Sequence, residues 1–256
     1  DADAASSPGA VRHLRFRAEG RRHNSLAAHL RAATSPRIIA ETKQASPSAG
    51  IIVDPYDPAR IARDYAAAGA SGISVLTEPH HFKGSLEDLA AVRAAVDLPL
   101  LRKDFITHPF QVLEAAAYGA DVVLLIAALL DACALGKLYR AATDLGLETL
   151  VEVHIADELP RALDLEGAMI GVNNRNLTTL RTDLAVARRL ACSIPSERLA
   201  VAESGIKTAA DVGKLFGLGY RGFLVGEALL KSDSPCETLR QLISSATTVS
   251  SGGAAC

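Results

Sequence analysis

The chain has 256 residues, of which 49% are apolar and 22% are charged, and its formal net charge is −2. This balance is typical of a globular domain with a large core, and it argues against a nucleic-acid partner, which usually needs a concentrated basic surface. The longest apolar run, 122–130, is too short to cross a membrane. Residues 1–10 hold two aspartates and no apolar block, so we expect no secretory signal and a cytoplasmic location.

An N-terminal extension, 1–34, precedes the first strand pattern. Its first ten residues, 1–10, are small and polar, and we expect them to be disordered. Residues 11–34 are expected to be helical, with Leu26 and Leu30 on an apolar face.

Strand and helix patterns then alternate from 35 to 249 without a linker, and a tail, 250–256, is expected to be disordered. Eight short apolar segments predict strands: Arg37–Lys43, Gly72–Leu76, Pro99–Lys103, Asp121–Ile126, Glu148–Val153, Ala168–Asn173, Leu199–Glu203 and Arg221–Val225. A predicted helix follows each strand, and the helices begin at Asp57, Ser85, Pro109, Asp131, Ala156, Thr182, Lys207 and Ser234. This series predicts one catalytic domain of the α/β class, a (β/α)8 TIM barrel with a short N-terminal helical extension. A doubly wound open sheet is the alternative, but no GxGxxG motif follows the first strand.

Polar side chains end several strands on one face. Ile39, Glu41 and Lys43 share a face of the first strand, because alternate residues of a strand point to the same side. The third, fifth and sixth strands repeat this pattern and end in Lys103, Glu152, Asn173 and Arg175. If these faces point inward, the barrel interior is apolar at one end and charged at the carboxyl end of the strands, where barrel enzymes have their active sites. Burying such charges costs free energy, which is hard to explain unless the charges serve a function. We therefore favour an active site over a structural layer of ion pairs.

Glycines follow the last two strands. Ser204-Gly205 comes after the seventh strand and Gly226 after the eighth, where barrels often bind phosphate through backbone N–H groups. The loop 43–50 after the first strand is small and polar. It is either an ordinary surface loop or a loop that closes over a ligand.

Six segments in chain order together resemble the indole-3-glycerol phosphate synthase family. The segments are IIAETK with SPS (38–43 and 46–48), LRKDF (101–105), LVEVH (150–154), IGVNNRNL (170–177), AESGI (202–206) and FLVGE (223–227). The resemblance runs in register from Arg37 to Leu230, so chance is a poor explanation for it. The family often carries a serine where Glu227 stands, and the extension is shorter than usual, so we expect it to cover the substrate less well.

The resemblance implies a lyase of tryptophan biosynthesis. Its phosphorylated substrate is 1-(2-carboxyphenylamino)-1-deoxyribulose 5-phosphate, and its products are indole-3-glycerol phosphate, carbon dioxide and water. The family uses no cofactor and no metal. Consistently, the four cysteines are widely spaced without a CxxC pair, which argues against zinc. We expect a monomer that can associate with other enzymes of the tryptophan pathway, but not with a membrane.

The resemblance also implies roles for individual residues. Lys103 resembles the general acid that protonates the substrate carbonyl, and Glu152 resembles the acid/base residue of the later dehydration. Glu41, Lys43 and Asn173 match the other catalytic positions. Neighbouring cations are expected to lower the pKa of Lys103 towards the working pH. The positions predicted to contact substrate are Ser46, Arg175, Glu203, Ser204, Gly205, Gly226 and Glu227, with Phe105 and Leu124 as an apolar seat for the aromatic ring.

Two other functions compete with this one. A different phosphosugar barrel could use Lys103 as a Schiff-base nucleophile, although Arg102 and Asp104 flank it and such an amine prefers a desolvated environment. A non-catalytic barrel that binds a phosphorylated ligand is the second alternative. Such a binder has no need for paired acids and bases. The presence of Glu41, Lys43, Lys103 and Glu152 together therefore argues against it.

Overall fold

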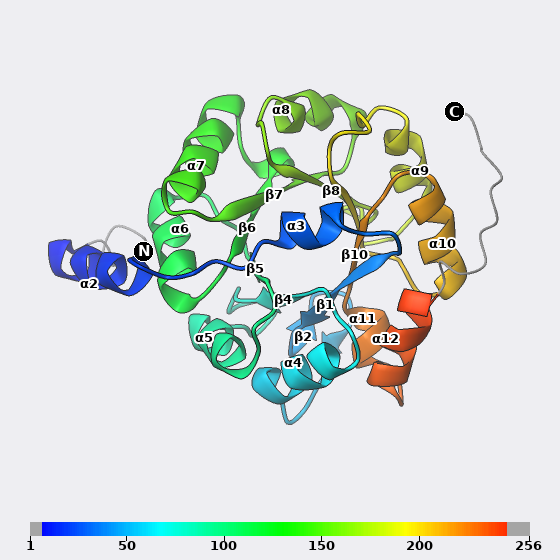
Figure 1. The fold of residues 1–256 in the computed structure, drawn as a ribbon, viewed down its shortest axis with the longest axis horizontal. Helices are drawn as coiled ribbons and strands as arrows, with labels where there is room; N and C mark the ends of the chain where they lie inside the picture. Colours follow the sequence, from blue (N-terminus) through cyan, green and yellow to red (C-terminus); the bar gives the residue numbers. More distant parts are fainter. Residues whose placement is uncertain (1–6, 245–256) are drawn as a thin grey trace.

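The computed structural model describes residues 7–244, which form a closed barrel of eight parallel strands surrounded by helices (Figure 1). Around the barrel the strands follow the order β1-β10-β9-β8-β7-β6-β5-β4. The barrel strands are β1 (Arg37–Thr42), β4 (Gly72–Leu76), β5 (Leu100–Lys103), β6 (Val122–Ile126), β7 (Glu148–Val153), β8 (Met169–Asn173), β9 (Ala200–Glu203) and β10 (Gly222–Val225). The (β/α)8 TIM barrel predicted from the alternation of strands and helices is confirmed.

Helices cover the outer face of the barrel. They are α4 (Pro58–Ala67), α5 (Leu86–Ala95), α6 (Pro109–Tyr118), η1 (Ala127–Leu129), α7 (Ala132–Asp144), η2 (Ala156–Glu158), α8 (Leu159–Leu163), α9 (Ala185–Ala191), α10 (Ala209–Gly217), α11 (Glu227–Leu230) and α12 (Pro235–Ser244). The helix expected from Thr182 begins later because Thr182 pairs with Arg175 in a β-bridge. Within residues 7–244, no helix is both long and apolar enough to cross a bilayer.

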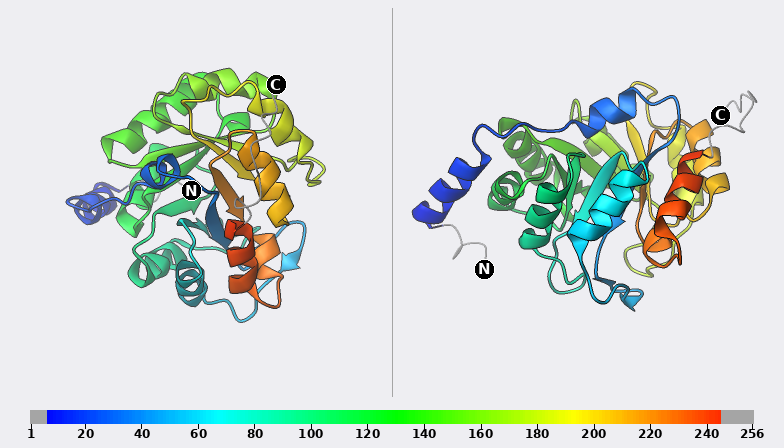
Figure 2. Two further views of the ribbon diagram at one scale, coloured as in Figure 1. Left: turned by 45° about the vertical axis from the view of Figure 1, so that its right-hand side comes forward. Right: turned by 60° about the horizontal axis from the view of Figure 1, so that its bottom comes forward.

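The N-terminal extension contains two helices, α2 (Pro8–Ala18) and α3 (Leu26–Arg31), where one helix was expected. Leu26 and Leu30 of α3 are buried and pack in one cluster with Val122 and Val201, which lie at the beginnings of their strands. The helix α3 therefore closes the amino end of the barrel. Figure 2 shows α3 at one end of the molecule and the short hairpin β2 (Ala45–Ser46) to β3 (Gly50–Ile51) at the other. The extension thus supports the barrel at its amino end, and none of its described residues lines the cavity at the carboxyl end.

Disorder was expected at 1–10 and 250–256. Residues 1–6, the tail and the last residues of the predicted barrel domain lie outside the described part of the chain. Residues 8–10, however, belong to α2. Proline at the first helical position and the Ser7 hydroxyl, which accepts a hydrogen bond from the first turn, stabilise this start of a helix.

The barrel interior shows the alternation predicted from the sequence. Ile39, Leu101, Leu150 and Leu224 belong to one buried cluster inside the barrel, together with the side chains of α3. The intervening strand residues belong to a second cluster that faces the surrounding helices. Because every strand runs in the same direction, the polar residues that follow these apolar ones converge at the carboxyl end.

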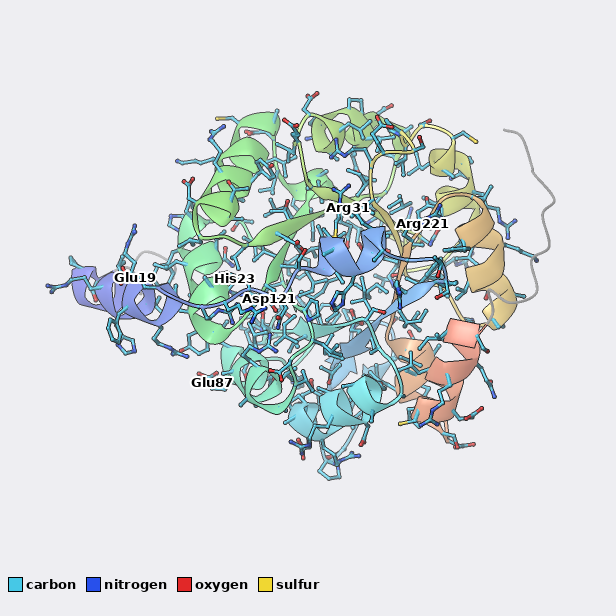
Figure 3. The ribbon with its side chains drawn as sticks, in the orientation of Figure 1. Glu19, His23, Arg31, Glu87, Asp121 and Arg221 are labelled. Carbon is cyan, nitrogen blue, oxygen red and sulfur yellow. The ribbon has the colours of Figure 1, made fainter. Side chains whose placement is uncertain are left out.

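Asp121 fastens the extension to the amino end of the barrel (Figure 3). One carboxylate oxygen accepts hydrogen bonds from Arg21 at 3.0 Å and from the backbone N–H of Asn24 at 3.1 Å. The other accepts from Arg93 and from the backbone N–H of Leu100, both at 2.9 Å. The side chain of Asp121 is fully buried, so these four donors supply all the compensation for its lost hydration.

Replacing this carboxylate should destabilise the fold. Asp121→Ala leaves two arginines and two backbone N–H groups without their acceptor, and we expect the free energy of unfolding to fall by about 3–5 kcal/mol. Urea denaturation measures the loss. Asp64→Ala is the matched control, because it breaks an exposed pair with Arg60 and should cost less than about 1 kcal/mol. Equal losses in the two variants would contradict the anchoring role.

Candidate active site

A cavity of about 950 Å³ lies at the carboxyl end of the barrel. Its walls are the last residues of the barrel strands and the loops that follow them. Every site residue predicted from the sequence lines this one cavity: Glu41, Lys43, Ser46, Lys103, Phe105, Leu124, Glu152, Asn173, Arg175, Glu203, Ser204, Gly205, Gly226 and Glu227. The fold thus brings together residues that are spread over most of the chain.

Lys103 lies at the centre of a buried charged cluster. Its Nζ is 3.1 Å from Glu152 Oε2 and 3.5 Å from Glu203 Oε2. The exposed fractions of the three side chains are 16%, 2% and 1%, respectively. A second pair, Lys43 and Glu41, forms beside it, with 2.5 Å between Nζ and Oε1. Charges of opposite sign are therefore held together above the apolar interior.

The environment of Lys103 stabilises its charged form. Burial lowers the pKa of Lys103, but the negative charges of Glu152, Glu203 and Glu41 outweigh burial and raise it above its ordinary value. The expected lowering by neighbouring cations is wrong. Lys43 is itself paired with Glu41, and the charges that act on Lys103 are those of Glu152, Glu203 and Glu41.

The two carboxylates beside Lys103 have opposite character. Burial raises the pKa of Glu152, but the charge of Lys103 and hydrogen bonds from His154 and Asn173 bring it below its usual range. Burial also raises the pKa of Glu203; Lys103 lowers it in part, and repulsion by Glu152 contributes to a final value of about 8. The environment therefore favours the ionised form of Glu152 and the protonated form of Glu203.

The sequence neighbours of Lys103 are paired with each other. Arg102 is buried on the outer face of β5, where it donates to Asp104 Oδ2 at 2.9 Å and to the carbonyl oxygen of Gln111 at 2.6 Å. These flanking charges neutralise each other. They do not keep Lys103 solvated, as the sequence suggested, because alternate strand residues point to opposite sides.

Two glycines make room for the carboxylates. A Cβ atom at Gly171 would collide with Glu203 Oε1 and would also press on Leu150. A Cβ atom at Gly226 would lie 2.5 Å from Glu41 Oε1. A side chain at either position would force the neighbouring carboxylate to move, so glycine suits both positions.

Ser204 and Glu227 line the side of the cavity formed by β9 and β10. Ser204 has a φ of 62°, which is a strained conformation for a residue other than glycine and is often found at binding sites. Glu227 is 2.7 Å from Lys231 and 3.6 Å from Arg175. The hydrogen bond from Lys231 is the main reason that the pKa of Glu227 is lowered. The carboxylate at the position where the family often has serine is thus balanced by two cations.

The loop after β1 contains the hairpin β2–β3 rather than irregular chain. Ala45 and Ser46 are buried, and the backbone N–H of Ala45 donates to the carbonyl oxygen of Phe82 at 3.2 Å. The hairpin is therefore attached to the segment that follows β4. Ser46, Pro47 and Ser48 contribute to the cavity wall.

Sequence reasoning missed the contribution of β4. Glu78 lines the cavity, and its carboxylate accepts hydrogen bonds from the backbone N–H groups of His80, His81 and Phe82. These bonds shape the segment that brings His81 and Phe82 to the cavity wall. Alternation along β4 was an available sign, because Glu78 follows Leu76 with the same parity. Other lining residues that were missed include Leu177, Leu180, Lys207 and Lys231.

The family model for indole-3-glycerol phosphate synthase matches residues 4–242. The chain belongs to this family. The indole-3-glycerol phosphate synthase of Rhodospirillum rubrum is 49% identical over 209 residues, which are 81% of this chain and 80% of the relative. That of Saccharopolyspora erythraea is 52% identical over 206 residues, 80% of this chain and 77% of the relative. The resemblance inferred from six segments is therefore confirmed.

Solved structures of other proteins share the fold. 3-Hexulose-6-phosphate synthase from Salmonella typhimurium has a TM-score of 0.64, with coverage of 82% of this chain and 98% of the other. Thiamine phosphate pyrophosphorylase from Pyrococcus furiosus has a TM-score of 0.60, with coverage of 83% and 95%. Both are 16% identical to this chain, so they support the barrel architecture alone.

A side chain introduced at position 171 tests whether Glu203 needs the space beside Gly171. Gly171→Ala forces a methyl group against the carboxylate, and we expect a loss of about 1–3 kcal/mol in the free energy of unfolding. Denaturant unfolding measures it. Gly217→Ala is the control, because no atom lies within 4 Å of its added Cβ. A Gly171→Ala variant as stable as this control would show that the carboxylate does not need the space.

Glu203 should also make stability depend on pH. Its pKa rises from 4.5 to about 8 on folding, so between these values the folded chain holds a proton that the unfolded chain has lost. The contribution of this group to stability therefore falls as pH rises through that interval. Glu203→Gln removes the effect. We expect the stability of the wild type relative to this variant, measured in urea, to decline from about pH 5 to about pH 8; a constant difference would contradict the assignment.

Proposed function

We propose that the cavity converts 1-(2-carboxyphenylamino)-1-deoxyribulose 5-phosphate into indole-3-glycerol phosphate, carbon dioxide and water, with Lys103 as the general acid. The family makes this chain an enzyme, a carboxy-lyase of tryptophan biosynthesis that acts on a phosphorylated small molecule. One observation carries the residue assignment: the Lys103 ammonium is held between two buried carboxylates at the mouth of the barrel.

Ring closure needs an electrophilic carbonyl. We assign to Lys103 the donation of a proton to the carbonyl oxygen while the aromatic carbon attacks the carbonyl carbon. The carboxylates keep the ammonium charged before the reaction, and burial strengthens its interaction with the negative charge that develops on the oxygen. Loss of carbon dioxide from the same aromatic carbon then restores the aromatic ring.

Dehydration needs a proton donor and a proton acceptor. One proton goes to the leaving hydroxyl group, and another leaves the newly formed five-membered ring. The ionised Glu152 is suited to accept a proton. Lys103, 3.1 Å away, supplies the other once it has regained from solvent the proton that it gave in ring closure. Asn173 orients Glu152, since its own side-chain oxygen accepts from the backbone N–H of Arg175 and leaves its amide nitrogen for the carboxylate. Glu41 and Lys43 complete the charged mouth.

The remaining lining residues suit the two ends of the substrate. We propose that Ser204, Gly205 and Gly226 hold the phosphate near Arg175, because this wall combines backbone N–H groups with a cation. Ser46, Glu203 and Glu227 complete that side, with Lys231 balancing the charge of Glu227. Phe105 is 41% exposed and Leu124 is buried, and together they offer an apolar seat to the aromatic ring.

A Schiff-base aldolase is less well supported. A nucleophilic amine must lose its proton, and enzymes achieve this by lowering the pKa of the lysine. The carboxylates around Lys103 do the opposite.

The oligomeric state, the location and the partners of the protein are proposed as well. We propose a monomer in the cytoplasm that can associate with other enzymes of the tryptophan pathway and binds neither nucleic acid nor membrane. No cofactor or metal is proposed, and residues 7–244 contain no group of three or more His, Cys, Asp or Glu side chains placed to hold a metal. Light scattering of the purified protein tests the oligomeric state.

Substitution of Lys103 tests the assigned chemistry. Lys103→Ala removes the proton donor, and we expect kcat to fall by at least about 100-fold. The fluorescence of the indole product measures turnover. Lys137→Ala, at an exposed lysine on α7, should retain full activity. Full activity of Lys103→Ala would overturn the role of Lys103, and a borohydride-trapped substrate adduct in the wild type would favour the aldolase.

A further inference from the structure

His154 lies directly behind the proposed proton acceptor. Its Nε2 is 3.3 Å from Glu152 Oε1, while the other oxygen of Glu152 faces Lys103. Its Nδ1 is 3.7 Å from Glu158 Oε2. The imidazole ring is only 11% exposed, so it lies between two buried carboxylates at the end of β7. The reaction steps proposed above do not use it.

The chain fixes Glu158 in this position. The segment η2 begins immediately after His154 and Ile155, and it turns Glu158 back over the end of the strand. Glu158 Oε2 accepts a hydrogen bond from the backbone N–H of His154 at 2.6 Å. The Glu158 side chain is 9% exposed. Glu158 is thus tied to the same residue whose ring it faces.

The number of protons on the His154 ring determines how many hydrogen bonds it can donate. A neutral imidazole has one donor nitrogen and one acceptor nitrogen, whereas an imidazolium has two donors. A ring placed between two carboxyl groups can therefore donate to both only when each of its nitrogens carries a proton. Neither ring nitrogen has a well-aligned hydrogen bond within the described residues, so both remain available to the carboxylates beside them. Catalytic contacts are often long or poorly aligned before substrate binds.

We propose that His154, held by Glu158, is a positioning residue that donates to Glu152 Oε1 and directs Glu152 Oε2 towards Lys103 and the substrate. This inference rests on the proposed function, in which Glu152 accepts a proton. It gives each oxygen of Glu152 a separate hydrogen-bonding partner. The carboxylate then keeps one orientation and stays ionised in a site where burial alone favours its neutral form.

The surrounding charges agree with this role. The titratable groups that face His154 are Glu152 from β7 and Glu158 from η2. Lys103 from β5 and Glu203 from β9 lie on the far side of Glu152. The proximity of His154 lowers the pKa of Glu152, in addition to the larger effect of Lys103. Without His154, the pKa of Glu152 should rise.

The pH dependence of turnover separates positioning from simple structural support. Activity that needs ionised Glu152 is lost as pH falls through its pKa, so removal of His154 should move the acid limb of the kcat profile to higher pH. His154→Leu removes both donor and charge. His154→Gln keeps an N–H donor without the charge, so it should recover part of the loss. Glu158→Gln weakens the interaction that positions the His154 ring, so it should also move the acid limb of the kcat profile to higher pH.

The experiment measures kcat, KM and their pH profiles for the full chain and these three variants. We expect kcat of His154→Leu to fall about 10- to 100-fold, the size typical of a misplaced reactive group, while KM stays within about 2-fold. The matched controls are His13→Gln and Glu166→Gln, at exposed positions away from the cavity, and both should behave like the wild type.

Two results would overturn the inference. One is a folded His154→Leu variant with the kcat and acid limb of the wild type; the other is a fall in kcat with no movement of the acid limb. If His154→Leu does not fold, Glu158→Gln decides, and an unchanged profile in that variant overturns the inference. Glu152→Gln is measured in parallel. Its inactivity upholds the role of Glu152 whatever the His154 variants do, whereas its full activity would refute that role and the inference with it.

Discussion

The Lys103 ammonium is buried at the end of an apolar barrel, and the arrangement of the site depends on compensating its charge. Glu152 and Glu203 supply that compensation from two other strands. Their presence in turn requires space, which Gly171 provides by having no side chain. The same constraint recurs nearby, where Glu41 pairs with Lys43 and occupies the space above Gly226. The cluster is thus a set of mutually dependent positions, in which each charge is tolerated because another opposes it.

Because the strands are parallel, the two ends of the barrel differ: one contributes to stability and the other contains the site. At the amino end, α3 covers the apolar interior and Asp121 ties the preceding chain to the barrel. At the carboxyl end, the strands finish in polar residues and their loops surround a cavity. Stability is therefore concentrated at one end, and the charged groups that chemistry needs can be placed at the other.

Buried carboxylates other than those beside Lys103 also help to arrange the site. Glu78 accepts three backbone hydrogen bonds and shapes the segment after β4, which in turn holds the hairpin β2–β3 through Phe82. His154 and Glu158 lie behind Glu152 in a comparable way. In both cases a buried carboxylate gives direction to a group that lines the cavity, which is how a reactive geometry is maintained on flexible side chains.

The sequence by itself determined the barrel and the composition of its mouth. Alternation along each strand showed that Glu41, Lys103, Glu152 and Asn173 share the inner face, because this pattern is a local property of extended chain. The electrostatic character of the site was decided only by the tertiary structure. The sequence led us to expect cations near Lys103, whereas residues from distant strands surround it with carboxylates and raise its pKa. The place of α3 and the contact between His154 and Glu152 were likewise decided by packing, since the energy of a buried charge depends on which side chains approach it in space.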